Sequence, residues 1–363
     1  SPTAERAWKR VREEDLDVVL LDLQLPGMDG LTFFRGLKAL GDPPQVIILS
    51  GETRARMELV VSGSSARMLS REVHTSLRGR GTETVIRPFS FREFLRHRGE
   101  EPEGKARALT SAKRSRVERF FGEYLAAGGF PEAQGLAAGL RVELLQGYVD
   151  TVLFRDVVER RGVTQVAALR WLTRQCLKNP AGSFSVHRLH QDLKAQGLGV
   201  AKDALHAMVG HLEDAFLLRC VPLATESERR RNSNPRKIYP VDAGMIGAFD
   251  RTGRSNVGHA LETVVLHELD RRQAEVGYVR TGTGHEVDFL ARFHGGREEL
   301  IQVCADTGPA ETRERELRAL EEALREHPRA TPKLLVLNFE QLAVKVSPGV
   351  TVQAAYQWLL DVD

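Results

Sequence analysis

Residues 17–25 read DVVLLDLQL and are followed directly by Pro26 and Gly27. A short apolar run that contains β-branched residues and ends at turn residues predicts a buried parallel strand. Residues 31–40, LTFFRGLKAL, have helical spacing, and residues 45–50, QVIILS, form a second apolar run. Strand, helix and strand in this order predict a right-handed parallel crossover, and therefore an α/β fold.

The rest of the chain alternates between helical and strand-like segments. Residues 117–178 have helical periodicity, and residues 183–223 predict a helix, a turn, a second helix and a strand. From residue 236 onward, short apolar runs alternate with predicted helices at 259–274 and 310–326. The expected fold class is α/β, with a partial parallel sheet at the N-terminus, a helical and winged-helix middle, and an α/β C-terminal domain.

The composition excludes several classes of protein. The 363 residues include 52 Lys and Arg against 49 Asp and Glu, which disfavours a uniformly basic nucleic-acid-binding surface but allows a local basic patch. No run approaches the ~20 apolar residues of a membrane span, and no signal peptide opens the chain, so we expect no membrane partner. Three widely spaced cysteines exclude a disulfide scaffold and suit the cytoplasm.

The N-terminal segments resemble a known signalling domain. DVVLLDLQLPGMDG (17–30) and QVIILSG (45–51) resemble the phosphoacceptor and switch strands of CheY-like response-regulator receivers, a resemblance that covers about residues 1–53. It implies that Asp22 is the phosphorylated carboxylate and Ser50 the switch hydroxyl. The acidic pair that holds Mg²⁺ in receivers would precede Ser1, and a start within a predicted helix leaves N-terminal truncation open. We therefore interpret residues 1–55 as a partial receiver-like segment, the remnant of a sheet, and not as a working receiver.

A second resemblance covers most of the remaining chain. ELVVSGSS and the residues that follow it (58–95), YLAAGGFPEA (124–133), RKIYPVDAGM (236–245) and HEVDFLARF (285–293) occur in an order similar to a family of prokaryotic AAA+-type ATPases. Those proteins carry a C-terminal domain of unknown function. The resemblance assigns residues 56–98 to the C-terminal part of the ATPase core. The further predicted domains are a linker at 99–116, a helical and winged-helix domain at 117–225, and a C-terminal domain at 226–363.

The ATPase resemblance implies ATP and Mg²⁺ as cofactors, but the sequence lacks the motifs that would bind them. The candidate nucleotide contacts are Ser62, Ser64, Arg78 and Arg80. The arginines could equally pair with nearby acids. Walker A and Walker B motifs would lie before residue 58, where the receiver-like segment stands. GEEPEGKA (99–106) has the spacing of a phosphate-binding loop, but Ala106 lacks the hydroxyl that ligates Mg²⁺. We expect no ATP hydrolysis.

Residues 185–215 predict a helix-turn-helix, and the strand after them makes it winged-helix-like. The second helix carries few cations, which disfavours base-specific reading of DNA. A basic segment follows, and the candidate nucleic-acid contacts are Arg229, Arg230, Arg231, Arg236 and Lys237. The alternatives are a module that packs against protein and a merely solvated loop.

The C-terminal residues resemble the restriction-endonuclease-like core. The candidate residues are Glu262, Asp288 and Gln302. Active members of that fold hold Mg²⁺ with two acids and a Glu-x-Lys strand. Here Gln302 replaces the glutamate and Cys304 the lysine, and we expect Glu286 to point away from Asp288. The resemblance therefore predicts the fold without nuclease activity. His187 and His190 lie three residues apart on a helix, but no metal site is expected.

The leading hypothesis is a degenerate AAA+-type family protein that lacks Walker A and B and binds protein or nucleic acid without catalysis. The first alternative is a phosphorelay signalling protein that uses Asp22 as phosphoacceptor. The second is a nuclease that uses Glu262, Asp288 and Gln302.

Overall fold

The computed structural model describes Trp8 and residues 18–22, 30–38, 45–49, 84–104, 106–233, 235–250 and 256–361. The chain divides into two compact units, residues 1–64 and 65–363. Five of the predicted site residues lie outside the described residues: Ser50, Ser62, Ser64, Arg78 and Arg80. The same holds for most of the predicted ATPase-core segment.

The first unit contains the predicted strand, helix and strand. They are β1 (Val18–Asp22), α2 (Gly30–Lys38) and β2 (Gln45–Leu49). The two strands are parallel, and Asp22 is paired with Leu49. Phe33 and Leu37 lie one helical turn apart on α2 and are both buried. The parallel pairing confirms the expected α/β pattern and puts Asp22 at the carboxyl end of β1.

The second unit begins with helices. They are α4 (Phe91–His97), η1 (Ala106–Ala108), α5 (Ser111–Ala127), η2 (Pro131–Ala133), α6 (Ala138–Val152), the π-helical η3 (Leu153–Glu159) and α7 (Val166–Lys178). Ser90 and Glu93 cap α4 reciprocally, each side chain accepting a hydrogen bond from the other residue's backbone N–H. Both η1 and the first turns of α5 lie within residues 99–116, the predicted linker.

A pair of helices and a small sheet follow. They are β3 (Ser183–Phe184), α8 (Val186–Ala195), α9 (Lys202–Asp214), β4 (Leu218–Val221), α10 (Glu228–Ser233) and β5 (Arg236–Pro240). The strand order is β3-β5-β4, and β5 is antiparallel to both neighbours. Leu193, Leu205 and Leu212 are buried in the core of this module. The predicted order of helix, turn, helix and strand is confirmed.

The C-terminal part is a mixed sheet covered by helices. Its elements are α11 (Gly244–Phe249), α12 (Val257–Arg271), β6 (Glu275–Arg280), β7 (Glu286–Arg292), β8 (Glu298–Cys304), α13 (Ala310–Glu326), β9 (Thr331–Val336), η4 (Glu340–Ala343), β10 (Thr351–Ala354) and α14 (Ala355–Leu360). The strand order is β10-β9-β8-β7-β6. Strands β8 to β10 are parallel, whereas β6 to β8 are antiparallel.

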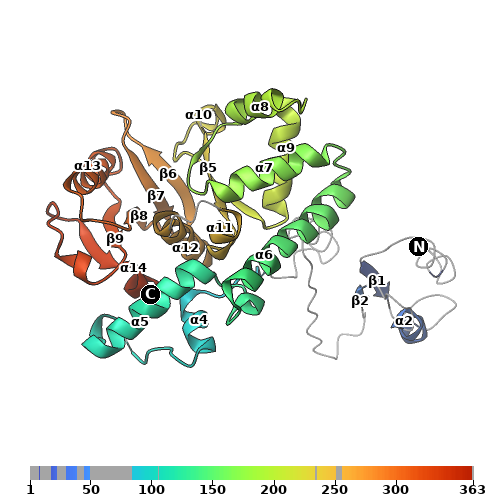
Figure 1. Ribbon diagram of the computed structural model, residues 1–363, viewed down its shortest axis with the longest axis horizontal. Coiled ribbons are helices and arrows are strands. Elements are labelled where there is room, and N and C mark those ends of the chain that lie inside the picture. The colour runs from blue at the N-terminus through green and yellow to red at the C-terminus, as the bar shows by residue number, and fades with distance from the viewer. Residues whose placement is uncertain are drawn as a thin grey trace. The chain divides into compact units, whose positions relative to one another are not determined.

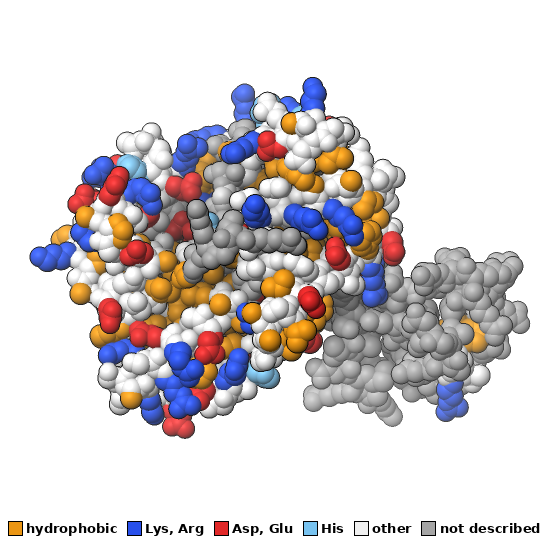
Figure 2. Space-filling model, viewed as in Figure 1, with side chains coloured by type: hydrophobic (Ala, Val, Ile, Leu, Met, Phe, Trp, Pro, Cys, Tyr) orange, Lys and Arg blue, Asp and Glu red, His pale blue; other side chains and the backbone are white. Residues whose placement is uncertain are grey.

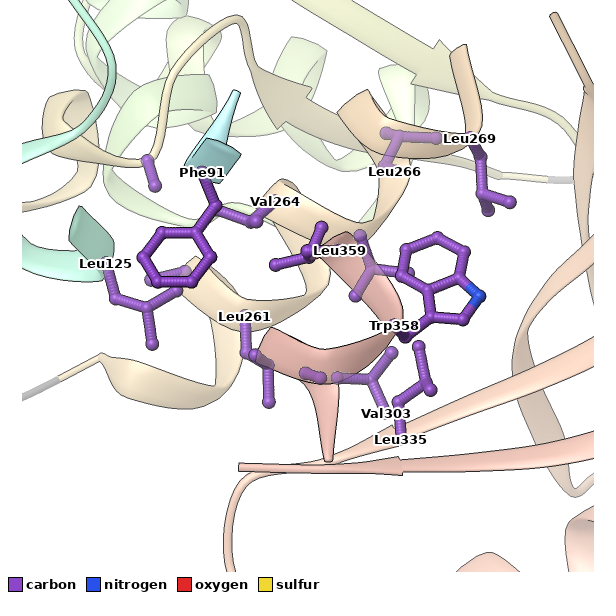
Figure 3. Close-up of a cluster of buried hydrophobic side chains, with 14 of the residues drawn as sticks. Phe91, Leu125, Leu261, Val264, Leu266, Leu269, Val303, Leu335, Trp358 and Leu359 are labelled. Atoms are coloured by element: carbon purple, nitrogen blue, oxygen red, sulfur yellow. The ribbon is translucent and has the colours of Figure 1, made fainter. Parts of the chain in front are cut away.

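Two separate hydrophobic clusters cover this sheet. One cluster contains α13 and the other α12 and α14, and Figure 1 shows α13 and α12 on opposite sides of the strands. Figure 3 shows Trp358 and Leu359 of α14 packed near Leu261 and Val264 of α12, with Phe91 of α4 in the same cluster. One core therefore joins segments from both sides of the predicted linker.

None of the described helices is long and apolar enough to cross a bilayer. All three cysteines are free and buried, so they act as small apolar side chains.

Candidate functional site

The side chain of Lys237 lies within a group of carboxylates. Its Nζ is 2.8 Å from Glu286 Oε1, 3.0 Å from Asp288 Oδ1 and 4.0 Å from Glu262 Oε2. We call Lys237 and these three acids the carboxylate cluster. Lys237 comes from the central strand of the three-stranded sheet, whereas the acids come from β7 and α12. The cluster therefore joins two sheets of the same unit.

The alternation of side chains along β5 brings Lys237 to this place. Arg236 is exposed, whereas Lys237 is buried, because successive residues of a strand point to opposite faces. Tyr239, two residues further on, shares the face of Lys237, and its hydroxyl donates a hydrogen bond to Glu262 Oε2 at 3.2 Å. Lys237 is thus not available to nucleic acid, which corrects the sequence-based expectation for this residue.

The expectation for Glu286 was also wrong. Glu286 and Asp288 both contact Lys237 Nζ, so they lie on the same side of β7 at this point. Residues two apart along a strand share a face, and this rule should have been applied to the sequence. An irregular register between β6 and β7 occurs in the same region.

The charges of the cluster stabilise the ammonium form of Lys237. Burial by itself lowers the pKa of Lys237, but the negative charges of Asp288, Glu262 and Glu286 outweigh it and raise that pKa. Burial, together with the nearby charge of Asp288, holds the pKa of the Glu262 carboxyl well above its usual range. The Asp288 carboxylate is also held by a hydrogen bond from the Val303 backbone N–H, which donates to its Oδ2 at 3.0 Å.

Gln302 and Cys304, the two replacements on β8, are both engaged elsewhere. Gln302 Oε1 accepts from the Asp288 backbone N–H at 3.3 Å, and its amide nitrogen donates to Glu316. The Cys304 thiol donates to the Asp306 carbonyl oxygen at 3.2 Å, and burial raises its pKa to about 11. Cys304 is therefore a neutral thiol, and the ammonium group near the acids comes from β5 instead of β8.

The resemblance to nucleases implies Mg²⁺, but the residues do not fit it as they are arranged. Mg²⁺ requires oxygen ligands in near-octahedral geometry around one point. Glu262 and Asp288 face a lysine ammonium, and both polar groups of Gln302 are already hydrogen-bonded. In the part of the chain that the structure describes, no group of three or more His, Cys, Asp or Glu side chains is arranged to hold a metal.

In the segment 99–106, which has the spacing of a phosphate-binding loop, a glutamate is paired with two arginines of α4. Glu101 forms ion pairs with Arg92 at 3.0 Å and Arg96 at 2.6 Å. The hydrogen bonds from these arginines lower the pKa of the Glu101 carboxyl to about 2. Ala106 is buried at the start of η1. A carboxylate held in this way repels phosphate, so this segment is not a nucleotide loop.

The other basic candidates are distributed unevenly. Arg229, Arg230 and Arg236 are exposed, whereas Arg231 is half-buried and donates to the Thr225 carbonyl oxygen at 2.9 Å. The α8–α9 pair adds further exposed cations, which are Arg188, Lys194 and Lys202. Figure 2 shows Lys and Arg side chains over the end of the molecule that α8 and α10 form. We call the six exposed side chains the α8–α10 basic surface; they are Arg188, Lys194, Lys202, Arg229, Arg230 and Arg236. On α8, His187 contacts Gln191 and Lys202, not a metal-binding partner.

Comparison with known families supports the two resemblances in part. The sequence matches the Response regulator receiver domain over residues 2–68, an AAA domain over 45–95, and a Domain of unknown function (DUF8612) over 118–256. The receiver match extends beyond the expected residue 53 and overlaps the AAA match. The chain is thus related to AAA-domain proteins over part of its length, with a receiver match at its N-terminus.

Three curated proteins are each similar to part of this chain. An uncharacterized protein of Methanocaldococcus jannaschii is 30% identical over 273 residues, which are 74% of this chain and 59% of the relative. An uncharacterized protein of Haemophilus influenzae is 26% identical over 236 residues, 65% of this chain and 56% of the relative. The chain therefore spans less than two thirds of either relative. A protein-glutamate methylesterase/protein-glutamine glutaminase of Cereibacter sphaeroides is 46% identical over 61 residues, 17% of this chain and 16% of the relative.

Proposed function

We propose that this chain is a non-hydrolytic relative of AAA-domain ATPases that binds double-stranded DNA through the α8–α10 basic surface. The observation that carries the proposal is the exposure of Arg229 and Arg230 on the connection between β4 and β5, and of Arg236 at the start of β5. In a winged helix this connection is the wing. The two helices, the turn between them and the antiparallel β3-β5-β4 sheet support that interpretation.

The chemistry favours contact with phosphates over the reading of bases. Guanidinium groups bind phosphate oxygens with two parallel hydrogen bonds, and such contacts position a protein on DNA without selecting sequence. On α9 the exposed polar side chains near its start are Lys202, Asp203 and His206. Because Asp203 lies beside only two hydrogen-bond donors, this end of α9 is poorly suited to reading base edges. Binding should therefore be strongly dependent on salt and weakly dependent on sequence.

The arrangement of the carboxylate cluster disfavours the alternative function of a nuclease. Nucleases with a restriction-endonuclease-like core hold a divalent ion with their acids and use it to activate water. In this chain Lys237 forms an ion pair with Asp288, and Gln302 and Cys304 supply neither a carboxylate nor an ammonium.

Fluorescence anisotropy with a labelled DNA duplex over a series of salt concentrations tests the proposal. We expect the R229A/R230A/R236A variant to bind at least tenfold more weakly, and the slope of log K against log salt to fall by about 2.7. The matched control is R318A/R325A/R329A, which removes three exposed cations on and after α13. Equal binding by both variants would contradict DNA contact at this surface and leave protein as the partner class.

The receiver match favours a second candidate function. Asp22 ends β1 and is paired with Leu49 of the parallel strand β2, the position of a phosphoacceptor in a receiver. Incubation with acetyl phosphate and Mg²⁺, followed by detection of acid-labile phosphate, compares the wild type with Asp22→Asn. Phosphate on the wild type alone supports signalling through Asp22, and its absence from both contradicts it.

A further inference from the structure

A cleft of about 480 Å³ lies between α6 and α7. Arg170, Arg174 and Lys178 line it from α7, Asp150 and Val149 from α6, and Phe249 from the end of α11. None of these residues belongs to the α8–α10 basic surface or to the carboxylate cluster. The cleft is thus a separate feature of the helical part of the molecule.

The three cations follow one another along α7. They are spaced four residues apart, so each step along α7 rises about 6 Å. All three are exposed, and Figure 2 shows Lys and Arg side chains over α7. This spacing suits successive phosphates of an extended chain, each of which carries one negative charge.

The row is only partly neutralised by the protein. Arg170 lies 3.8 Å from Asp150, and its guanidinium stacks over the Phe154 ring at 4.6 Å from the centroid. Within the described ranges of the chain, no carboxylate forms an ion pair with Arg174 or Lys178. Asp150 is the acidic side chain among the residues that line the cleft. The cleft therefore carries net positive charge, which attracts an anionic ligand.

The other lining residues favour a particular kind of anion. Phe249 is half-buried and adds aromatic surface beside the cations. A positively charged groove with an aromatic side chain is the combination that binds single-stranded nucleic acids, because unpaired bases can stack on the ring. In a duplex the bases are already stacked and paired. Inorganic polyphosphate shares the charge of this ligand but has no base.

We propose that the α6–α7 cleft binds single-stranded nucleic acid, with Arg170, Arg174 and Lys178 along the phosphates and Phe249 against a base. This goes beyond the proposed function, since it adds a second surface and a second ligand class. Duplex DNA is assigned to the α8–α10 basic surface, and the two sites share no residue.

Anisotropy with a labelled oligothymidylate, which forms no duplex of its own, tests the proposal on the full chain. We expect R174E/K178E to bind at least tenfold more weakly than the wild type, and Phe249→Leu about fivefold or more. R318E/R325E on α13 is the matched charge-reversal control and should bind as the wild type does. Unchanged binding by R174E/K178E would overturn the proposal. R174A/K178A repeats the test with milder changes if the reversed charges impair folding.

Two further arms distinguish this site from its alternatives. R229A/R230A/R236A should keep oligothymidylate binding while it loses duplex binding, so either assignment can fail alone. Inorganic polyphosphate should compete more weakly than unlabelled oligothymidylate of equal charge. Equal competition, together with an unaffected Phe249→Leu variant, would show a phosphate site that ignores bases and would overturn the single-strand assignment. Loss of duplex binding in R174E/K178E to the same degree would overturn it too.

Discussion

The α8–α10 basic surface and the carboxylate cluster meet at two adjacent residues of β5. Arg236 is exposed on the basic surface, whereas the Lys237 ammonium lies within 4.0 Å of three carboxylates. In the sequence the two residues form one basic run. A strand sends neighbours to opposite faces, so adjacent cations can have opposite roles. One is left for a partner, while the other is neutralised inside the protein.

The largest expected effect comes from the buried member of the pair. Lys237→Met removes the cation and leaves Asp288 and Glu286 without it, so the free energy of unfolding should fall by about 3–5 kcal/mol. Urea denaturation at neutral pH measures this change. The control is Arg236→Met, which should stay within about 0.5 kcal/mol of the wild type. Equal stability of the two variants would contradict the contrast between the two residues.

His267 is a second buried basic side chain, and it differs from Lys237 because it lies outside the carboxylate cluster. His267 donates to the Pro240 carbonyl oxygen at 2.7 Å. Burial outweighs the attraction of Asp270 and lowers the pKa of His267 to about 4. Its unfolded pKa is about 6.5. The stability it contributes is therefore complete above pH 6.5 and is lost as the pH falls towards 4, by about 3 kcal/mol.

Urea denaturation of the wild type and of His267→Gln across this pH range measures that loss. The variant should destabilise less on acidification. Burial raises the pKa of Asp242 to about 6, so this group acts in the opposite direction over the same range. For this reason the quantity to compare is the difference in free energy of unfolding between the wild type and His267→Gln at each pH, not the wild-type value alone. Parallel curves would contradict a neutral buried His267.

A smaller effect is expected at the edge of the cluster. Tyr239→Phe removes the hydrogen bond to Glu262 and should cost about 1 kcal/mol. Combined with Lys237→Met, the loss should be less than additive, because both side chains act on Glu262. Strict additivity in a double-mutant cycle would argue that the two contacts are independent.

The smallest effect on stability is expected on the exposed side. R229A/R230A/R236A should unfold within about 0.5 kcal/mol of the wild type in urea. A clear loss of stability would mean that these arginines hold the fold together, and weaker DNA binding by this variant would then have another explanation.

The sequence predicted elements with a strong local pattern. The predicted helix at 310–326 coincides with α13, and the apolar run EVDFLARF (286–293) forms β7 at Glu286–Arg292. The start of α5 was missed, because its first turns are polar and its buried residues begin at Val117. Periodicity alone cannot reveal a helix whose first turns bury no apolar side chain.

The site was less predictable than the fold. The sequence shows Cys304 at the position where the nuclease resemblance expects a lysine, and the structure adds that this thiol is buried. The placement of Lys237 was not visible, because Lys237 and Asp288 are 51 residues apart and belong to different sheets. Their contact depends on how the two sheets pack. The shared side of Glu286 and Asp288 could have been predicted from strand geometry.

Lys237 neutralises the acids of the carboxylate cluster, and we expect this arrangement to exclude a divalent ion. Anomalous diffraction from crystals grown with MnCl₂ tests this most directly. We predict no manganese peak between Glu262 and Asp288, with Lys237 Nζ still within ion-pair distance of Asp288. A manganese ion bound to both carboxylates, with Lys237 displaced, would contradict the account.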